Sequence, residues 1–176
     1  MEYQKFTRLG EYLINEVGPL YRRTGKIDPV DLFLIFIWKA NRAKTKMRDK
    51  LKRNPQAKGS FRKATDQIAV ALQNTNDKQE KLAILMRDWK FQLPMASAVL
   101  TILYPNDFTI YDTLVCKEVG LAYQPNQRFS ERCWNNYQHY KELVCKHAPP
   151  KLSLREKDRY LRGRSIREKA ERDARS

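Results

Sequence analysis

The sequence contains no apolar run long enough to cross a bilayer. The nearest candidate, Leu32 to Trp38, is far shorter than the roughly 18 residues that a transmembrane helix needs, and basic residues follow it at once. The N-terminus mixes Glu2, Lys5 and Arg8 with scattered apolar residues, which is not the pattern of a signal peptide. We therefore expect a cytoplasmic, nucleoid-associated bacterial protein that has no membrane partner.

Cysteine and histidine are scarce. The three cysteines, Cys116, Cys133 and Cys145, are odd in number and far apart, which argues against a disulfide framework and favours reduced thiols in the core. The spacing of Cys133 and Cys145 with His139 and His147 matches no standard zinc finger, and we predict no metal site.

The motifs of several enzyme classes are also missing. No serine has a G-x-S-x-G setting, and two histidines near the C-terminus do not complete a Ser, His and Asp constellation. No Walker-type phosphate loop is present. These absences leave hydrolases and nucleotidases of those kinds without support.

Positive charge is abundant. The formal net charge is +15 and the isoelectric point is about 9.9. The positive charges of the chain repel one another and oppose a compact fold unless a polyanion binds. DNA, RNA and anionic lipid are all attracted to a surface of positive potential. The charge therefore predicts a polyanionic partner without choosing among these three.

The strongest basic stretch is residues 39–63, where Asp49 is the only acid. Its cations are Lys39, Arg42, Lys44, Lys46, Arg48, Lys50, Lys52, Arg53, Lys58, Arg62 and Lys63. A solvated helix face usually mixes both signs, so we favour a phosphate-contacting surface over a merely solvated one. Lys39, Arg42 and Lys44 are the contacts we expect first.

Apolar residues recur every three or four positions, which predicts an all-α protein. Asp28, Asp77 and Ser130 precede helical segments as N-cap signals. We expect helices over residues 4–17, 29–50, 60–73, 77–89, 94–104, 112–119, 130–147 and from 153 onward. Residues 1–165 are expected to form one domain, and 166–176 an exposed charged helix or tail.

Residues 88–115 read DWKFQLPMASAVLTILYPNDFTIYDTLV. A short turn, a helix of small residues, a proline-containing loop and an aspartate that opens the next helix resemble the core of the helix-hairpin-helix DNA glycosylases. The compact bacterial branch that resembles 8-oxoguanine glycosylases is the nearest in pattern. The likeness extends over most of Pro29 to Leu161, although its specific content lies between Trp89 and Gly120.

This resemblance implies two helical lobes around a central cleft, with a hairpin that grips a DNA phosphate. The hairpin would be Lys90-Phe91-Gln92, where both glycines of the family are missing. Lys90, Gln92 and Ser97 are the DNA contacts that it implies. The family often holds a monovalent cation on the hairpin carbonyls, whereas an iron-sulfur cluster would need four closely spaced cysteines.

The same resemblance makes Asp112 the candidate catalytic residue. A carboxylate there would stabilise positive charge on the deoxyribose and orient a water molecule. Pro94 lies where lyase-active members carry a lysine, so the resemblance implies a monofunctional enzyme. Asp112 also follows a loop and precedes Thr113, which fits a plain N-cap, and the two roles are compatible.

Two aromatic residues are candidates for stacking on an extruded base. Tyr111 precedes the candidate catalytic aspartate, and Trp38 borders the basic stretch. The alternative for both is burial in the core, which is where most aromatic residues at helical spacing lie.

The leading prediction is a monofunctional DNA glycosylase that acts on double-stranded DNA, without an organic cofactor, a catalytic metal or an obligate protein partner. The alternative is a non-catalytic helix-hairpin-helix DNA-binding protein of repair or defence, and a third possibility is a basic RNA-binding protein. The enzyme demands an open, base-sized pocket beside Asp112 and an aromatic side chain, which the binding protein does not.

Overall fold

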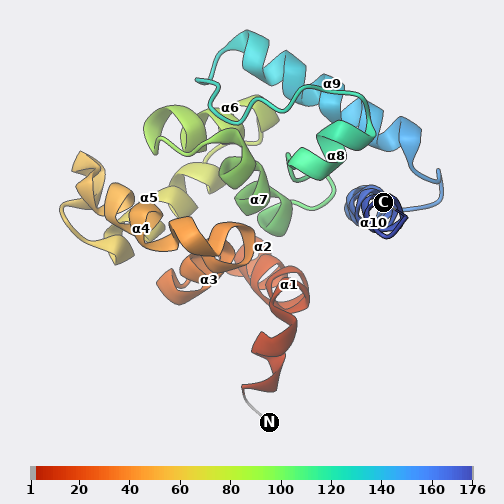
Figure 1. Cartoon of the computed structure of the whole chain (residues 1–176). Coiled ribbons are helices and arrows are strands. Elements are labelled where there is room, and N and C mark those ends of the chain that lie inside the picture. Colours follow the sequence, from red (N-terminus) through yellow and green to blue (C-terminus); the bar gives the residue numbers. More distant parts are fainter. Residues whose placement is uncertain (1–2, 176) are drawn as a thin grey trace.

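The computed structural model describes residues 3–175, and all regular structure in that range is helical (Figure 1). The α-helices are α1 (Leu9–Tyr12), α2 (Gly18–Thr24), α3 (Pro29–Ala40), α4 (Lys44–Arg53), α5 (Phe61–Gln73), α6 (Lys78–Ala83), α7 (Leu93–Leu103), α8 (Thr113–Glu118), α9 (Glu131–His147) and α10 (Leu154–Asp173). Short 3-10 or π-helical segments cover Gln4–Arg8, Leu13–Val17, Asn41–Ala43, Pro55–Ala57 and Ile84–Asp88. The predicted all-α class is confirmed, while the hairpin element, the two lobes and the central cleft remain predictions.

The helix starts follow the capping residues. The Asp28 carboxylate accepts a hydrogen bond from the Val30 backbone N–H at 2.8 Å. Asp77 caps α6 and Ser130 caps α9 in the same way. These side chains satisfy N–H groups that have no partner within the helix, which is why the predicted starts at these residues are correct.

The first predicted helix, residues 4–17, is too short. The chain continues through α2, because Pro19 occupies the first turn, where no backbone N–H is required. It ends at Gly25, whose φ of 70° is readily adopted by glycine and whose N–H donates to the Tyr21 carbonyl at 2.7 Å.

The predicted helix over residues 29–50 is interrupted. Ala40 leaves the helical region with φ of −154° and ψ of 67°, and the 3-10 turn Asn41–Ala43 separates α3 from α4. The Lys44 ammonium donates to the Asn41 carbonyl at 3.2 Å and to its side-chain oxygen at 2.7 Å. The basic stretch is therefore divided among the end of α3, α4 and the start of α5.

Helix α7 lies at the centre of the fold and contacts α2, α3 and α6 (Figure 1). All of its residues except Pro94 are buried. The small side chains of Ala96 and Ala98 leave room for neighbouring helices. A helix that is apolar all round has to be enclosed on every side, which explains this position.

The C-terminal helices pack on one another, α10 against both α8 and α9. Leu161 and Ser165 are buried in this packing, whereas residues 166–175 are exposed. Glu2 and Ser176, which entered the sequence predictions, lie outside the described residues. Across residues 3–175, no helix has the length and apolar character needed to cross a membrane.

The three cysteines are free thiols. Cys116 and Cys133 are buried, as predicted, but Cys145 is exposed. The prediction of a core thiol is therefore wrong for Cys145, because Val144 and not its neighbour lies on the buried face of α9. Within residues 3–175, no three His, Cys, Asp or Glu side chains are arranged to hold a metal ion.

Candidate functional site

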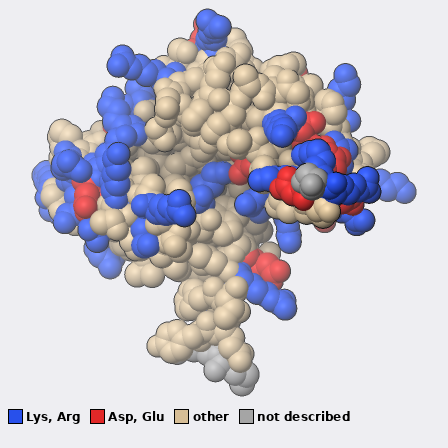
Figure 2. Space-filling model, in the orientation of Figure 1, with Lys and Arg blue, Asp and Glu red and all other residues tan. Residues whose placement is uncertain are grey.

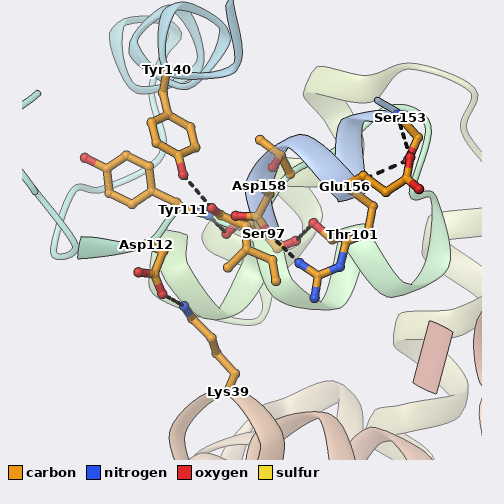
Figure 3. A network of polar contacts seen from close by, with 12 residues as sticks. Lys39, Ser97, Thr101, Tyr111, Asp112, Tyr140, Ser153, Glu156 and Asp158 are labelled. Carbon is orange, nitrogen blue, oxygen red and sulfur yellow. Dashed lines mark hydrogen bonds and ion pairs between the residues drawn. The ribbon is translucent and has the colours of Figure 1, made fainter. Parts of the chain in front are cut away.

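Two tyrosines of α9 hold the extended segment that leads to Asp112. The hydroxyl of Tyr137 donates to the Thr109 carbonyl at 2.7 Å. The hydroxyl of Tyr140 donates to the Ile110 carbonyl, also at 2.7 Å (Figure 3). Both tyrosine side chains are fully buried. Buried hydrogen bonds of this kind are expensive to break, so the segment has one defined course.

Ser97 of α7 holds the same segment from the other side. Its hydroxyl accepts a hydrogen bond from the Tyr111 backbone N–H at 2.9 Å and donates to the Pro94 carbonyl at 3.2 Å (Figure 3). Ser97 is fully buried. It therefore does not reach a surface ligand in this structure, although the sequence suggested it as a DNA contact, and its contacts are those of a positioning residue.

Asp112 is both a helix cap and half of an ion pair. One carboxylate oxygen accepts the Leu114 backbone N–H at 2.9 Å, and the other lies 3.0 Å from the Lys39 ammonium at the end of α3 (Figure 3). The two side chains are 18% and 14% exposed. The expected N-cap role is confirmed, and Lys39 joins Asp112 in a partly buried pair.

The environment of Asp112 favours the charged carboxylate. Burial acts to raise the pKa of Asp112, but the charge and hydrogen bond of Lys39, with the Leu114 N–H, outweigh it. The resulting pKa lies below the ordinary value for aspartate. Asp112 is therefore ionised at neutral pH, the state needed to stabilise a developing positive charge.

Asp158 of α10 is a second carboxyl group at this site, and sequence reasoning missed it. It is 2% exposed, forms an ion pair with Arg155, and its Oδ1 atom has no hydrogen-bond partner among residues 3–175. Burial raises the pKa of Asp158 to about 6, although the Arg155 charge opposes this. Leu154, Asp158 and Leu161 share one face of α10, so an acid within an apolar stripe was the available signal.

These groups line a small pocket formed by Trp38, Lys39, Ile110, Asp112, Asp158 and Arg162. Its volume is about 40 Å³. A water molecule needs at least roughly 10 to 15 Å³ by this kind of measure, so the pocket has room for a few waters and not for a base. The two carboxyl groups that face this space have pKa values shifted in opposite directions, a combination typical of acid-base sites.

A much larger groove shares two lining residues with this pocket. It has a volume of about 900 Å³ and runs between the N-terminal helical segment and α10. Trp38 and Arg162 line both spaces. The base-sized space therefore lies beside the Asp112 pocket, and these two side chains mark the junction.

The two aromatic candidates differ in position. Trp38 is half-buried, and the Arg155 guanidinium lies 5.4 Å from the centre of its ring. Tyr111 is 5% exposed, stacks on Tyr123 with ring centres 5.3 Å apart, and donates its hydroxyl to the Ala122 carbonyl. Trp38 thus lines the pocket with Arg155 against its ring, whereas Tyr111 belongs to the packing behind the pocket.

The turn before α7 has an unusual backbone. Lys90 adopts φ of 59°, in the left-handed region, at a position where the resemblance has a glycine. Phe91 is buried, while Lys90 and Gln92 are exposed, and Gln92 hydrogen-bonds to Asn126. The turn therefore exposes the two polar residues that the sequence suggested as DNA contacts.

Donors from the end of α4 occupy the carbonyls of this turn. The Lys50 ammonium donates to the Lys90 carbonyl at 2.6 Å, and the Asn54 amide donates to the Asp88 carbonyl at 2.8 Å. A monovalent cation would need such oxygens as ligands. These two carbonyl oxygens already accept hydrogen bonds, which does not fit a cation bound to both of them, as the resemblance implies.

The basic stretch is largely exposed. Figure 2 shows Lys and Arg side chains gathered on the side of the molecule formed by α4 and α5, whereas α10 mixes both signs. Arg42 is exposed, and Lys44 is folded back onto the Asn41 turn. Asp49, the single acid of this stretch, pairs with Arg48 at 2.8 Å.

Comparison of this chain with protein-family models, with curated proteins and with solved structures found no match.

Proposed function

We propose that this protein is a monofunctional DNA glycosylase, which removes a damaged or modified base from double-stranded DNA. One observation carries the proposal: an ionised, partly buried Asp112 lies in a small polar pocket that shares Trp38 and Arg162 with a much larger groove. A carboxylate beside an aromatic side chain is the arrangement that base extrusion and glycosidic hydrolysis need.

In this proposal, Asp112 stabilises the positive charge that develops on the deoxyribose as the bond from C1′ to the base nitrogen breaks. The bonding electrons leave with the base, and a water molecule forms the new bond to C1′. Asp158 lies in the same pocket with a pKa of about 6, a value suited to accepting the proton of that water. Lys39 keeps Asp112 ionised before the nucleotide arrives.

Exposed cations of residues 39–63 support a polyanionic partner, which in this proposal is double-stranded DNA. Lysines and arginines that neutralise phosphates release counterions, so affinity falls as salt concentration rises. We expect affinity for a duplex to fall by orders of magnitude between low and physiological salt. Binding that stays flat over this range would contradict the electrostatic part of the proposal.

A non-catalytic DNA-binding protein is the second candidate, because two features at Asp112 are compatible with it. The pocket of about 40 Å³ does not admit a base as it stands, and the carboxylate is already paired with Lys39. A protein that kept the scaffold for binding alone would tolerate both features.

Incubation with lesion-bearing duplexes distinguishes the two candidates. Wild type, Asp112→Asn and the surface control Asp66→Asn are incubated with duplexes that each contain 8-oxoguanine, uracil or 3-methyladenine, and strands are analysed before and after alkali. The glycosylase predicts breaks only after alkali, retained in Asp66→Asn and reduced about 100-fold or more in Asp112→Asn.

Two other results of this experiment would contradict the proposal. Intact strands throughout, with salt-sensitive binding by all three proteins, would favour the non-catalytic protein. Breaks that form without alkali would contradict the monofunctional assignment, which rests on Pro94 in place of a lysine.

A further inference from the structure

The turn formed by residues 89–92 carries its own positive charge, and that charge comes from α4. The Lys50 ammonium is fixed on the Lys90 carbonyl by the 2.6 Å hydrogen bond, and Asn54 holds the carbonyl of Asp88. An ammonium group on a carbonyl oxygen supplies what a bound alkali cation would supply, a single positive charge next to the turn.

The charges around Lys50 are crowded. Burial lowers the pKa of Lys50, and the neighbouring charges of Lys46 and Lys90 lower it further. Asp88, the nearest acid of the turn, is engaged by Arg87 at 2.8 Å. Like charges that repel one another in this way favour an anion that they can share.

An open groove lies in front of this cluster. It has a volume of about 570 Å³, and Asp88 is the acid in its lining. Its basic side chains come from α4, from the segment Ile84–Asp88 and from the turn, namely Lys50, Arg53, Arg87 and Lys90. Such a surface is concave and cationic, and it presents N–H donors. These are the properties that recognise a phosphodiester.

We propose that the Lys50 ammonium takes the place of a bound monovalent cation at the 89–92 turn, so that this turn binds a DNA phosphate without a metal ion. The inference rests on the proposed DNA binding, and it specifies which group supplies the positive charge at one DNA phosphate. It predicts that affinity for DNA depends on ionic strength but not on which monovalent cation provides it.

Fluorescence anisotropy with a lesion-free, labelled duplex tests this. Affinities of wild type, Lys50→Met and Lys46→Met are measured at one ionic strength in potassium, sodium and tetramethylammonium chloride. The last cation is too large to lie among backbone carbonyls. Lys46 is the matched control because it lies one turn earlier on α4 and loses the same charge. Thermal unfolding confirms that each variant is folded.

We expect wild type to bind equally, within about twofold, in all three salts. Lys46→Met should weaken binding equally in each and lower the slope of log affinity against log salt by about one. Lys50→Met should bind several-fold more weakly in tetramethylammonium than in potassium, because the freed Lys90 carbonyl then accepts a small cation.

Two results would overturn the inference, and they differ in what else they overturn. Wild type that binds at least fivefold more tightly in potassium than in tetramethylammonium would overturn the inference alone. A Lys50→Met variant that shows no difference among the salts would do the same. Absence of duplex binding by wild type in every salt would overturn the proposed function together with this inference.

Discussion

The Asp112 pocket and the 89–92 turn both contain charged side chains, but these are paired with opposite charges in the pocket and gathered as like charges at the turn. In the pocket, opposite charges are paired and withdrawn from water, with Lys39 on Asp112 and Arg155 on Asp158. At the turn, like charges from Lys50 and Lys90 lie together on the surface, with a backbone carbonyl as the hydrogen-bond acceptor.

This difference decides which region stabilises the fold and which one awaits a ligand. A buried ion pair that loses one partner leaves an uncompensated charge, and the cost appears in the stability of the folded protein. Surface cations of one sign cost little in folding, because solvent screens them, and they gain from binding an anion. Mutations in the pocket should therefore lower the stability of the folded protein, whereas mutations at the turn should lower its affinity for DNA.

The largest effect should follow the loss of Arg155, which covers Trp38 and pairs with buried Asp158. We expect Arg155→Met to lower the free energy of unfolding by about 3 to 5 kcal/mol at pH 7.5, measured by urea denaturation. Arg159→Met, on the exposed side of the same helix, should change it by less than about 0.5 kcal/mol. Equal changes in the free energy of unfolding for the two variants would contradict a stabilising role for the buried Arg155–Asp158 pair.

A smaller effect should appear in the pH dependence of stability. Because Asp158 has a pKa of about 6 in the fold and an ordinary value near 3.8 when unfolded, the folded protein holds a proton that the unfolded chain loses. The raised pKa of Asp158 therefore stabilises the folded protein fully below about pH 4. This stabilisation, about 3 kcal/mol in the free energy of unfolding, is lost as the pH rises through about 6.

The Asp158→Asn variant isolates that contribution, since the other carboxyl groups remain in both proteins. Between pH 4 and pH 7, the stability of wild type relative to Asp158→Asn should fall as pH rises. Parallel curves from denaturant titrations at several pH values would show that Asp158 titrates in the fold as it does in the unfolded chain.

The smallest effect concerns the turn. Lys90 has φ of 59°, which glycine adopts more easily, and the Lys50 hydrogen bond goes to the backbone carbonyl and survives the substitution. We expect Lys90→Gly to raise the free energy of unfolding by up to about 1 kcal/mol while weakening duplex binding. The control Lys52→Gly, within α4, should lower the free energy of unfolding by about 1 kcal/mol. A lower free energy of unfolding in both variants would contradict backbone strain at Lys90.

Much of the secondary structure could be predicted from local sequence. Asp28, Asp77 and Ser130 mark helix starts because a capping side chain bonds a backbone N–H only two or three residues away. The break at Ala40 could not be predicted in this way. Asn41 and Ala43 carry no strong stop signal, and the turn there is held by a lysine side chain.

The candidate site was predictable only in part. Asp112 was accessible to sequence reasoning because its place between a loop and a helix is local, whereas Asp158 was not. Ser97 was expected to contact DNA, and for Tyr111 both base stacking and burial in the core were open; both residues are buried. Periodicity does not indicate an exposed face on α7, since almost every residue of this helix is enclosed.

The sequence by itself determined the all-helical class, most helix starts and the strong positive charge, because capping, periodicity and composition act over a few residues. Only the tertiary structure decided that Lys39, Asp112 and Asp158 share one pocket and that Lys50 binds the Lys90 carbonyl. These groups come from separate helices, and their meeting depends on how α3, α8 and α10 pack and on how α4 lies against the turn. Packing of that kind is a property of the whole chain, and no local pattern encodes it.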